Sequence, residues 1–212
     1  MIIHGVFHVT FKNKKNKHMK KYIFNPFTQI AGVKALLLGV LVILLSAVLC
    51  FFSHAHFDGA LDAHFGAEGN IAQFFKEGFI DLASVIIVFY ILGLIVAGTR
   101  FRFVDMAGTM AFARIPLILT PLFALIFSPE KVIHYILYTF LHKGEPSTIS
   151  VLDIIGFVIA TLITILMVIW MIALMWNAFR ICMNSKKPKI VVTFIIGLLL
   201  AEVLSKITLI YL

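Results

Sequence analysis

The chain has 212 residues, of which 61% are apolar and only 13% are charged, and it contains 21 phenylalanines. A soluble domain is roughly 45–50% apolar and about 25% charged, so this composition excludes an ordinary soluble domain. Lysine and arginine number 18 against 10 acidic residues, a net charge of +8. In a membrane protein such an excess indicates orientation rather than nucleic-acid binding. We therefore predict an all-α polytopic membrane protein whose surroundings are the lipid bilayer, with no nucleic-acid partner.

Residues 1–24 are predicted to form a disordered, basic cytoplasmic arm. Met19, which opens the stretch MKKYIFNPF, is an alternative start of the chain. A basic region before an apolar run is also typical of a signal peptide, but this run is long and no cleavage site follows it, so we expect a retained span. Asn25 and Pro26 are typical of a helix start, with Asn as the cap and Pro at the first helical position. They predict a short interfacial helix before the first span.

Five apolar runs are long enough to cross a bilayer, whose hydrocarbon core of about 30 Å takes roughly 20 helical residues. They form a predicted membrane domain over residues 25–212, with spans at residues 33–52, 79–97, 106–127, 151–176 and 190–212. The third run contains Arg114, Pro116 and Pro121. Each proline removes a backbone donor, so we predict a helix break at both. The breaks free the carbonyls of Phe112 and Leu117 for a cation, for a threonine hydroxyl (Thr109 or Thr120) or for water.

The basic residues collect on one face of this five-span arrangement. That face carries Lys12, Lys14, Lys15, Lys17, Lys20, Lys21, Lys34, Arg100, Arg102, Arg180, Lys186, Lys187 and Lys189. The opposite face carries Lys76, Lys131 and Lys143. Because basic loops stay inside, the N-terminus is predicted to be cytoplasmic and Leu212 to lie outside. A rival arrangement, with residues 106–127 as a re-entrant hairpin, conflicts with this rule because it places Lys186, Lys187 and Lys189 outside.

Apart from Lys34 and Asp153, which lie at the ends of their spans, four charged residues fall within the spans: Asp81, Arg114, Glu202 and Lys206. A charge in the bilayer costs at least roughly 2.5–3.5 kcal/mol unless it finds a partner. At 1.5 Å per helical residue, Arg114 and Glu202 are expected at one depth, and Asp81 and Lys206 at another. We therefore predict a buried charge network that joins the second, third and fifth spans. Two roles stay open: fixing which helices are neighbours, or forming a proton or ion path beside the broken helix.

The loop after the first span, SHAHFDGALDAH, carries His54, His56, Asp58 and His64, with Asp62 between the last two. These are ligand types of a zinc or copper site. The loop lacks a framework of strands and helices, and its glycines are typical of a flexible segment. We expect a solvated loop that carries the acids of the outer face, with no resident metal and no cofactor. A weakly bound metal at the four candidate ligands is the alternative.

Residues 130–142, EKVIHYILYTFLH, predict a helix that lies on the outer membrane surface. Cys50 and Cys182 fall on opposite faces of the predicted bundle, so both are expected to be free thiols. The motifs G-x-x-x-x-G-K, G-x-S-x-G and H-E-x-x-H are all absent. No catalytic residue is therefore predicted, and we do not expect an enzyme.

Three stretches carry a resemblance to a known family: NPF at residues 25–27, GTMAFARIPLILTPL around Arg114, and WNAFRICMNSKKPKIVVTFIIGLLLAEVLSK at residues 176–206. In these the chain resembles the bacterial branch of the Yip family, the Ypt-interacting proteins, over roughly residues 25–212. The resemblance implies five helices, no known catalysis, and a place in the bacterial inner membrane.

The resemblance also implies a role in membrane organisation or in contact with lipid or other membrane proteins. Eukaryotic members of the family bind Rab-type GTPases through a long cytoplasmic N-terminal region, which this sequence lacks, so GTPase binding is not expected. A second hypothesis, from another class, is a small transporter or channel subunit with a charged site at the membrane midplane.

Overall fold

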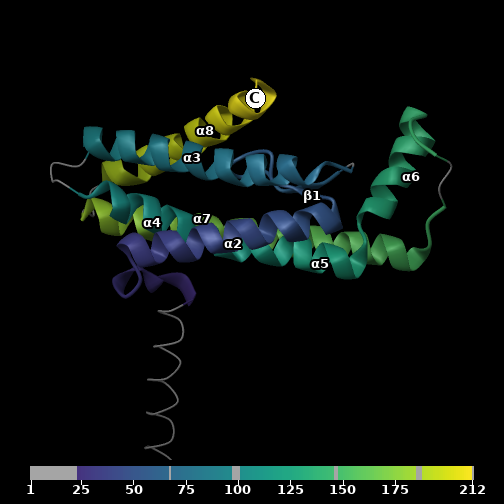
Figure 1. Ribbon diagram of the computed structural model, residues 1–212, viewed down its shortest axis with the longest axis horizontal. Coiled ribbons are helices and arrows are strands. Elements are labelled where there is room, and N and C mark those ends of the chain that lie inside the picture. The colour runs from purple at the N-terminus through teal and green to yellow at the C-terminus, as the bar shows by residue number, and fades with distance from the viewer. Residues whose placement is uncertain (1–22, 67, 97–100, 146–147, 185–187, 212) are drawn as a thin grey trace, which may run out of the picture.

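The computed structural model describes residues 23–66, 68–96, 101–145, 148–184 and 188–211. Five of its helices are long and apolar enough to cross a membrane, and they lie lengthwise beside one another in a bundle (Figure 1). The predicted fold class, an all-α polytopic membrane protein, is confirmed. The predicted basic arm and Met19 lie outside the described residues, apart from residues 23 and 24. The side on which each terminus lies stays a prediction.

The elements follow one another in the order η1 (Pro26–Thr28), α2 (Gly32–Ser53), β1 (Ala55–His56), β2 (His64–Phe65), α3 (Ile71–Val96), α4 (Phe103–Ala113), η2 (Ile115–Ile118), α5 (Leu119–Phe127), α6 (Glu130–Leu141), α7 (Val151–Met183) and α8 (Pro188–Tyr211). Two spans are much longer than predicted, since α3 begins at Ile71 rather than residue 79 and α7 continues past residue 176 to Met183. The 33 residues of α7 make a helix of about 50 Å. Such a helix tilts or extends beyond the hydrocarbon core.

The third span is broken at its prolines. It consists of α4, the 3-10 segment η2 and α5. Pro116 and Pro121 each lie in the first turn of a new segment, where a missing N–H costs little. The Thr109 hydroxyl donates to the Asp105 carbonyl at 2.7 Å, and Thr120 Oγ1 has no partner among the described residues. Of the three alternatives for the freed carbonyls, the threonine hydroxyls are therefore excluded, and a cation or water is left open.

Small residues bring α2 and α4 into backbone contact. A Cβ added to Gly108 would lie 2.2 Å from the Gly32 carbonyl oxygen. A Cβ added to Gly39 would lie 2.4 Å from the carbonyl carbon of Ala111. Only residues without a side chain allow two helices to approach so closely. This contact fixes the start of the broken third span against the first span.

The segment before the first span docks on the bundle. Two α7 side chains, Trp170 and Asn177, donate hydrogen bonds to the carbonyls of Ile23 and Phe24, at 3.0 and 2.8 Å. The predicted interfacial helix is only the single 3-10 turn η1, and Asn25 makes no capping hydrogen bond with its side chain. The side chains of α7 thus hold this segment by its carbonyls, and the cap predicted at Asn25 is not formed.

Two further expectations concern α6 and the cysteines. Residues Glu130–Leu141 do form a helix, which projects from one end of the bundle beside α7 (Figure 1); its place on the membrane surface stays a prediction. Cys50 and Cys182 are free thiols, as predicted.

Candidate functional site

The loop between α2 and α3 is folded into one end of the bundle. Strand β1 pairs antiparallel with β2, with Ala55 opposite Phe65, and Ala55, Phe57 and Ala60 are buried. The expectation of a solvated, flexible loop is therefore wrong. Its small and aromatic residues face the helices, and its backbone polar groups need partners, because a buried unpaired amide or carbonyl is costly. Charged side chains from three spans supply those partners.

The first anchor of the loop is Glu77 on α3. Its carboxylate accepts a hydrogen bond from the Phe57 amide at 3.2 Å and lies 2.9 Å from His56 Nδ1. Gln73, one turn earlier on α3, donates to the same carboxylate at 3.1 Å. Glu77 is buried, so these donors replace the water that a carboxylate otherwise binds. The backbone of β1 is thereby fixed to α3.

The second and third anchors are Glu202 on α8 and Arg114 at the junction of α4 and η2. The Leu61 amide donates to Glu202 at 2.7 Å, and Arg114 donates to the Ala60 carbonyl at 3.1 Å. A Cβ at Gly59 would lie 2.5 Å from a Glu202 oxygen, so only glycine lets the carboxylate reach the loop backbone. The loop thus joins α3, α8 and the third span.

Besides its contact with the loop, Arg114 forms a buried ion pair with Asp81 of α3. The guanidinium lies 2.9 Å from Asp81 Oδ2, and the two side chains are 3% and 0% exposed. The Ser205 hydroxyl of α8 donates to the other oxygen of Asp81. The predicted pairing at equal depth is therefore corrected: Arg114 pairs with Asp81 rather than with Glu202. Helix α8 is inclined to α3 (Figure 1), so equal residue counts along the two helices do not correspond to equal depths.

The other two residues of the predicted network face the loop. Lys206 Nζ lies 2.5 Å from Asp62, 3.7 Å from Glu202 and 4.0 Å from Asp58. Partial burial acts to raise the pKa of Asp62, but the hydrogen bond and positive charge of Lys206 outweigh it and hold that pKa below its ordinary value. The predicted network is thus divided in two. Arg114 and Asp81 form a buried inner pair, and the carboxylates of Asp58, Asp62 and Glu202 surround the ammonium group of Lys206.

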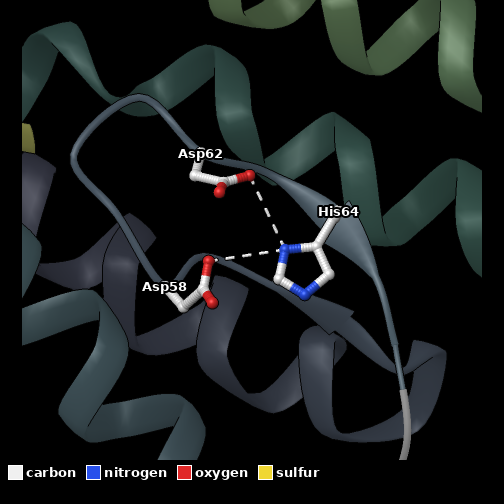
Figure 2. A group of neighbouring side chains, drawn as sticks. All are labelled: Asp58, Asp62 and His64. Carbon is white, nitrogen blue, oxygen red and sulfur yellow. Dashed lines mark ion pairs between the residues drawn. The ribbon is translucent and has the colours of Figure 1, made fainter. Parts of the chain in front are cut away.

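Three residues of the loop lie close enough to share a cation. Asp58, Asp62 and His64 each offer a ligand atom within 4.8 Å of the others, and His64 Nδ1 lies 3.4 and 3.6 Å from the two carboxylates (Figure 2). Of the predicted metal candidates, Asp58 and His64 are thus brought together, but His56 is held by Glu77.

The remaining candidate, His54, lies outside this group. The ammonium of Lys206 already supplies a positive charge to the carboxylates of Asp58 and Asp62. A metal ion bound there would compete with this lysine, so the donor set fits an ammonium group better than a metal.

A cleft of about 700 Å³ opens beside this group, between the first turns of α3 and the last turns of α8. It is lined by Asp58, Asn70, Ala72, Gln73, Lys76, Glu77, Lys206, Leu209 and Ile210. Sequence reasoning missed Glu77 and this cleft. The signal was a stripe of polar residues at a spacing of four, Gln73, Glu77 and Asp81, which lies on one face of a helix.

Comparisons of the chain with protein-family models, with curated proteins and with solved structures find no match. The class of the protein follows from its fold alone: it is a multi-pass membrane protein with five candidate spans in the described residues.

Proposed function

We propose that the chain is a non-enzymatic membrane protein of the Yip type in the bacterial inner membrane. It acts through contacts with lipid or with other membrane proteins, at the end of the bundle that carries the folded loop and the cleft. The observation that supports this proposal is the division of the charges. The innermost pair is closed and holds helices together, whereas the open polar surface lies at one end.

The alternative, a small transporter or channel subunit, requires a midplane charge that exchanges with water. Both oxygens of Asp81 accept hydrogen bonds, one from Arg114 and one from Ser205. The hollow that touches Arg114 has a volume of about 20 Å³ and mostly apolar walls, enough for about one water molecule. The residues that line the larger cleft include neither Asp81 nor Arg114. This geometry favours a structural pair over an ion path.

Reconstitution into liposomes tests the proposal. We expect proteoliposomes under a pH gradient or a potassium gradient to conduct no more than empty liposomes do. A wild-type flux above that of empty liposomes would overturn the proposal. Loss of this flux in Asp81→Asn, measured below the lowered melting temperature of that variant, would favour transport through the inner pair. An Asp153→Asn variant, which changes a half-buried acid at the start of α7 outside the inner pair, is the control for a general effect of losing one carboxylate.

A further inference from the structure

Helix α6 has two faces of opposite character. Its apolar residues recur at spacings of three and four and form one face, the apolar stripe: Val132, Ile133, Ile136, Leu137, Phe140 and Leu141. The opposite face carries Lys131, His134 and Tyr138, which are exposed. The helix is therefore amphipathic, a pattern typical of helices that lie in a membrane interface.

Protein covers only the start of the apolar stripe. Val132 is buried, and Ile133 packs against the core of the bundle. Further along, Ile136 is exposed, and the exposed fractions of Phe140 and Leu141 reach 72% and 57%. Helix α6 leaves the bundle across the direction of the spans (Figure 1). The same face thus points at the core where α6 begins and at the space beside the spans where it ends.

The level of α6 matches the ends of the neighbouring spans. The third span ends at Phe127, and α6 begins three residues later at Glu130. A Cβ added to Gly156 would lie 3.0 Å from the Phe127 carbonyl oxygen, so the second turn of α7 also meets this point. Spans end where hydrocarbon gives way to polar headgroups. Because α6 runs across the spans, it lies along that boundary.

The two helices next to α6 present apolar surface beside it. Leu125 and Ile126 are exposed near the end of α5, and Val151 and Leu152 are exposed at the start of α7. Helix α6 follows α5 after two residues and packs on α7. In a multi-pass membrane protein, acyl chains cover such faces of the spans. The apolar stripe extends that lipid-facing surface, so its continuity with the spans favours lipid over a protein partner as its cover.

We propose that α6 is an amphipathic wedge in one leaflet. Ile136 and Phe140 lie among the acyl chains at the end of the bundle that carries the folded loop, while Lys131 and Tyr138 face the headgroups. The 12 residues of α6 make a helix about 18 Å long and about 10 Å wide, whose insertion expands that leaflet and not the other. Membrane binding of such helices depends on curvature, so the protein favours membranes that are convex on this side. This inference rests on the proposed function, because it names lipid as the contact made at that end.

Spin labels on the two faces of α6 test the insertion. In a background with both cysteines replaced by alanine, Ile136→Cys and Phe140→Cys place a nitroxide on the apolar stripe. His134→Cys and Tyr138→Cys place one on the opposite face at the same spacing. In nanodiscs that hold one copy, labels at 136 and 140 should collide often with oxygen and rarely with a water-soluble nickel chelate, at a depth of about 5–10 Å below the phosphates. Labels at 134 and 138 should show the reverse.

Two results would overturn the inference. Frequent collision of the label at residue 140 with the nickel chelate would mean that the apolar stripe lies in water. Rare collision with both oxygen and nickel would mean that protein covers it, and if this occurs only in vesicles that hold several copies, the cover is a second copy. Contact with protein would still agree with the proposed function, which falls instead if the wild type conducts ions.

Narrow tubes pulled from giant liposomes test the expansion of one leaflet. With the loop end facing outward, the fluorescently labelled wild type should be enriched in the tube relative to the flat membrane. Ile136→Glu with Phe140→Glu should lose that enrichment, because charges on the apolar stripe oppose insertion. The matched control, His134→Glu with Tyr138→Glu, should keep it. Equal enrichment of the two double variants, or none in the wild type, would overturn the wedge; the spin labels test insertion without relying on the folding of the glutamate variants.

Discussion

Replacing Asp81 by asparagine should destabilise the protein strongly. The change keeps the size of the side chain but leaves the buried guanidinium of Arg114 without its counter-charge, and the Arg114 side chain is only 3% exposed. Breaking a buried ion pair by removing one partner costs about 3–5 kcal/mol, because the other charge stays buried and unpaired. For a chain of this size, 1 kcal/mol corresponds to about 2–4 °C in melting temperature. We therefore expect a loss of roughly 6–20 °C.

The double variant Asp81→Leu with Arg114→Leu should recover much of this loss, because it removes both charges together. Recovery should be incomplete. The Ser205 hydroxyl and the Ala60 carbonyl each lose a hydrogen-bond partner, which costs about 1–3 kcal/mol for each group that stays buried and unsatisfied. The loss of stability that remains in the double variant therefore measures these two hydrogen bonds, including the one by which Arg114 holds the loop.

Thermal unfolding in one detergent, followed by intrinsic fluorescence, is the assay. The control is Asp105→Asn, which breaks the exposed ion pair between Arg102 and Asp105 and should shift the melting temperature far less. Two results would refute the idea that the pair holds the bundle. One is a melting temperature of Asp81→Asn equal to that of the wild type. The other is a double variant that loses as much stability as Asp81→Leu and Arg114→Leu lose separately when their losses are added.

Three further predictions follow from the contacts described. Gly108→Val should destabilise the protein by about 1–3 kcal/mol, seen as a lower melting temperature, because its side chain would enter the backbone of α2. Glu202→Ala should speed hydrogen exchange at the Leu61 amide roughly 10- to 100-fold, since that amide loses its acceptor. Because the pKa of Asp62 is lowered in the folded chain, its contribution to stability should be complete above the ordinary Asp pKa of about 3.9 and be lost as the pH falls through the lower folded value. Loop exchange measured against pH should therefore rise only in strong acid, and Asp62→Asn should remove that rise; a loss beginning near pH 6 would contradict the assignment.

The five spans could be predicted from sequence because length and apolar content decide them without knowledge of neighbours. The prolines likewise located the break in the third span, since the loss of a backbone donor is a local effect. The predicted start of the second span, at residue 79, is wrong because Lys76 and Glu77 interrupt the apolar run although the helix begins at Ile71. A helix end that lies against a folded loop tolerates charges that lipid would exclude.

The site could not be predicted because its partners come from different spans. Nothing local to SHAHFDGALDAH indicates that Glu77 and Glu202 accept from its backbone. The charges inside the spans do pair with one another, Arg114 with Asp81 and Lys206 with Glu202. What the sequence did not indicate is that Arg114 and Glu202 also bind a carbonyl and an amide of the loop. Whether Asp81 and Arg114 lie at the same depth depends on how their helices are inclined. A count of residues along each helix carries no information about that inclination.

Accessibility of the inner part of α8 tests the central claim most directly. In a background with both cysteines replaced by alanine, Ala201→Cys places a thiol at a position that is fully buried, one turn from Ser205, and Asn70→Cys places one at the rim of the cleft. The account predicts that a hydrophilic thiol reagent labels residue 70 rapidly and residue 201 only on unfolding. Labelling of residue 201 at a comparable rate in the folded protein would contradict a closed inner pair and indicate a water-filled path through the bundle.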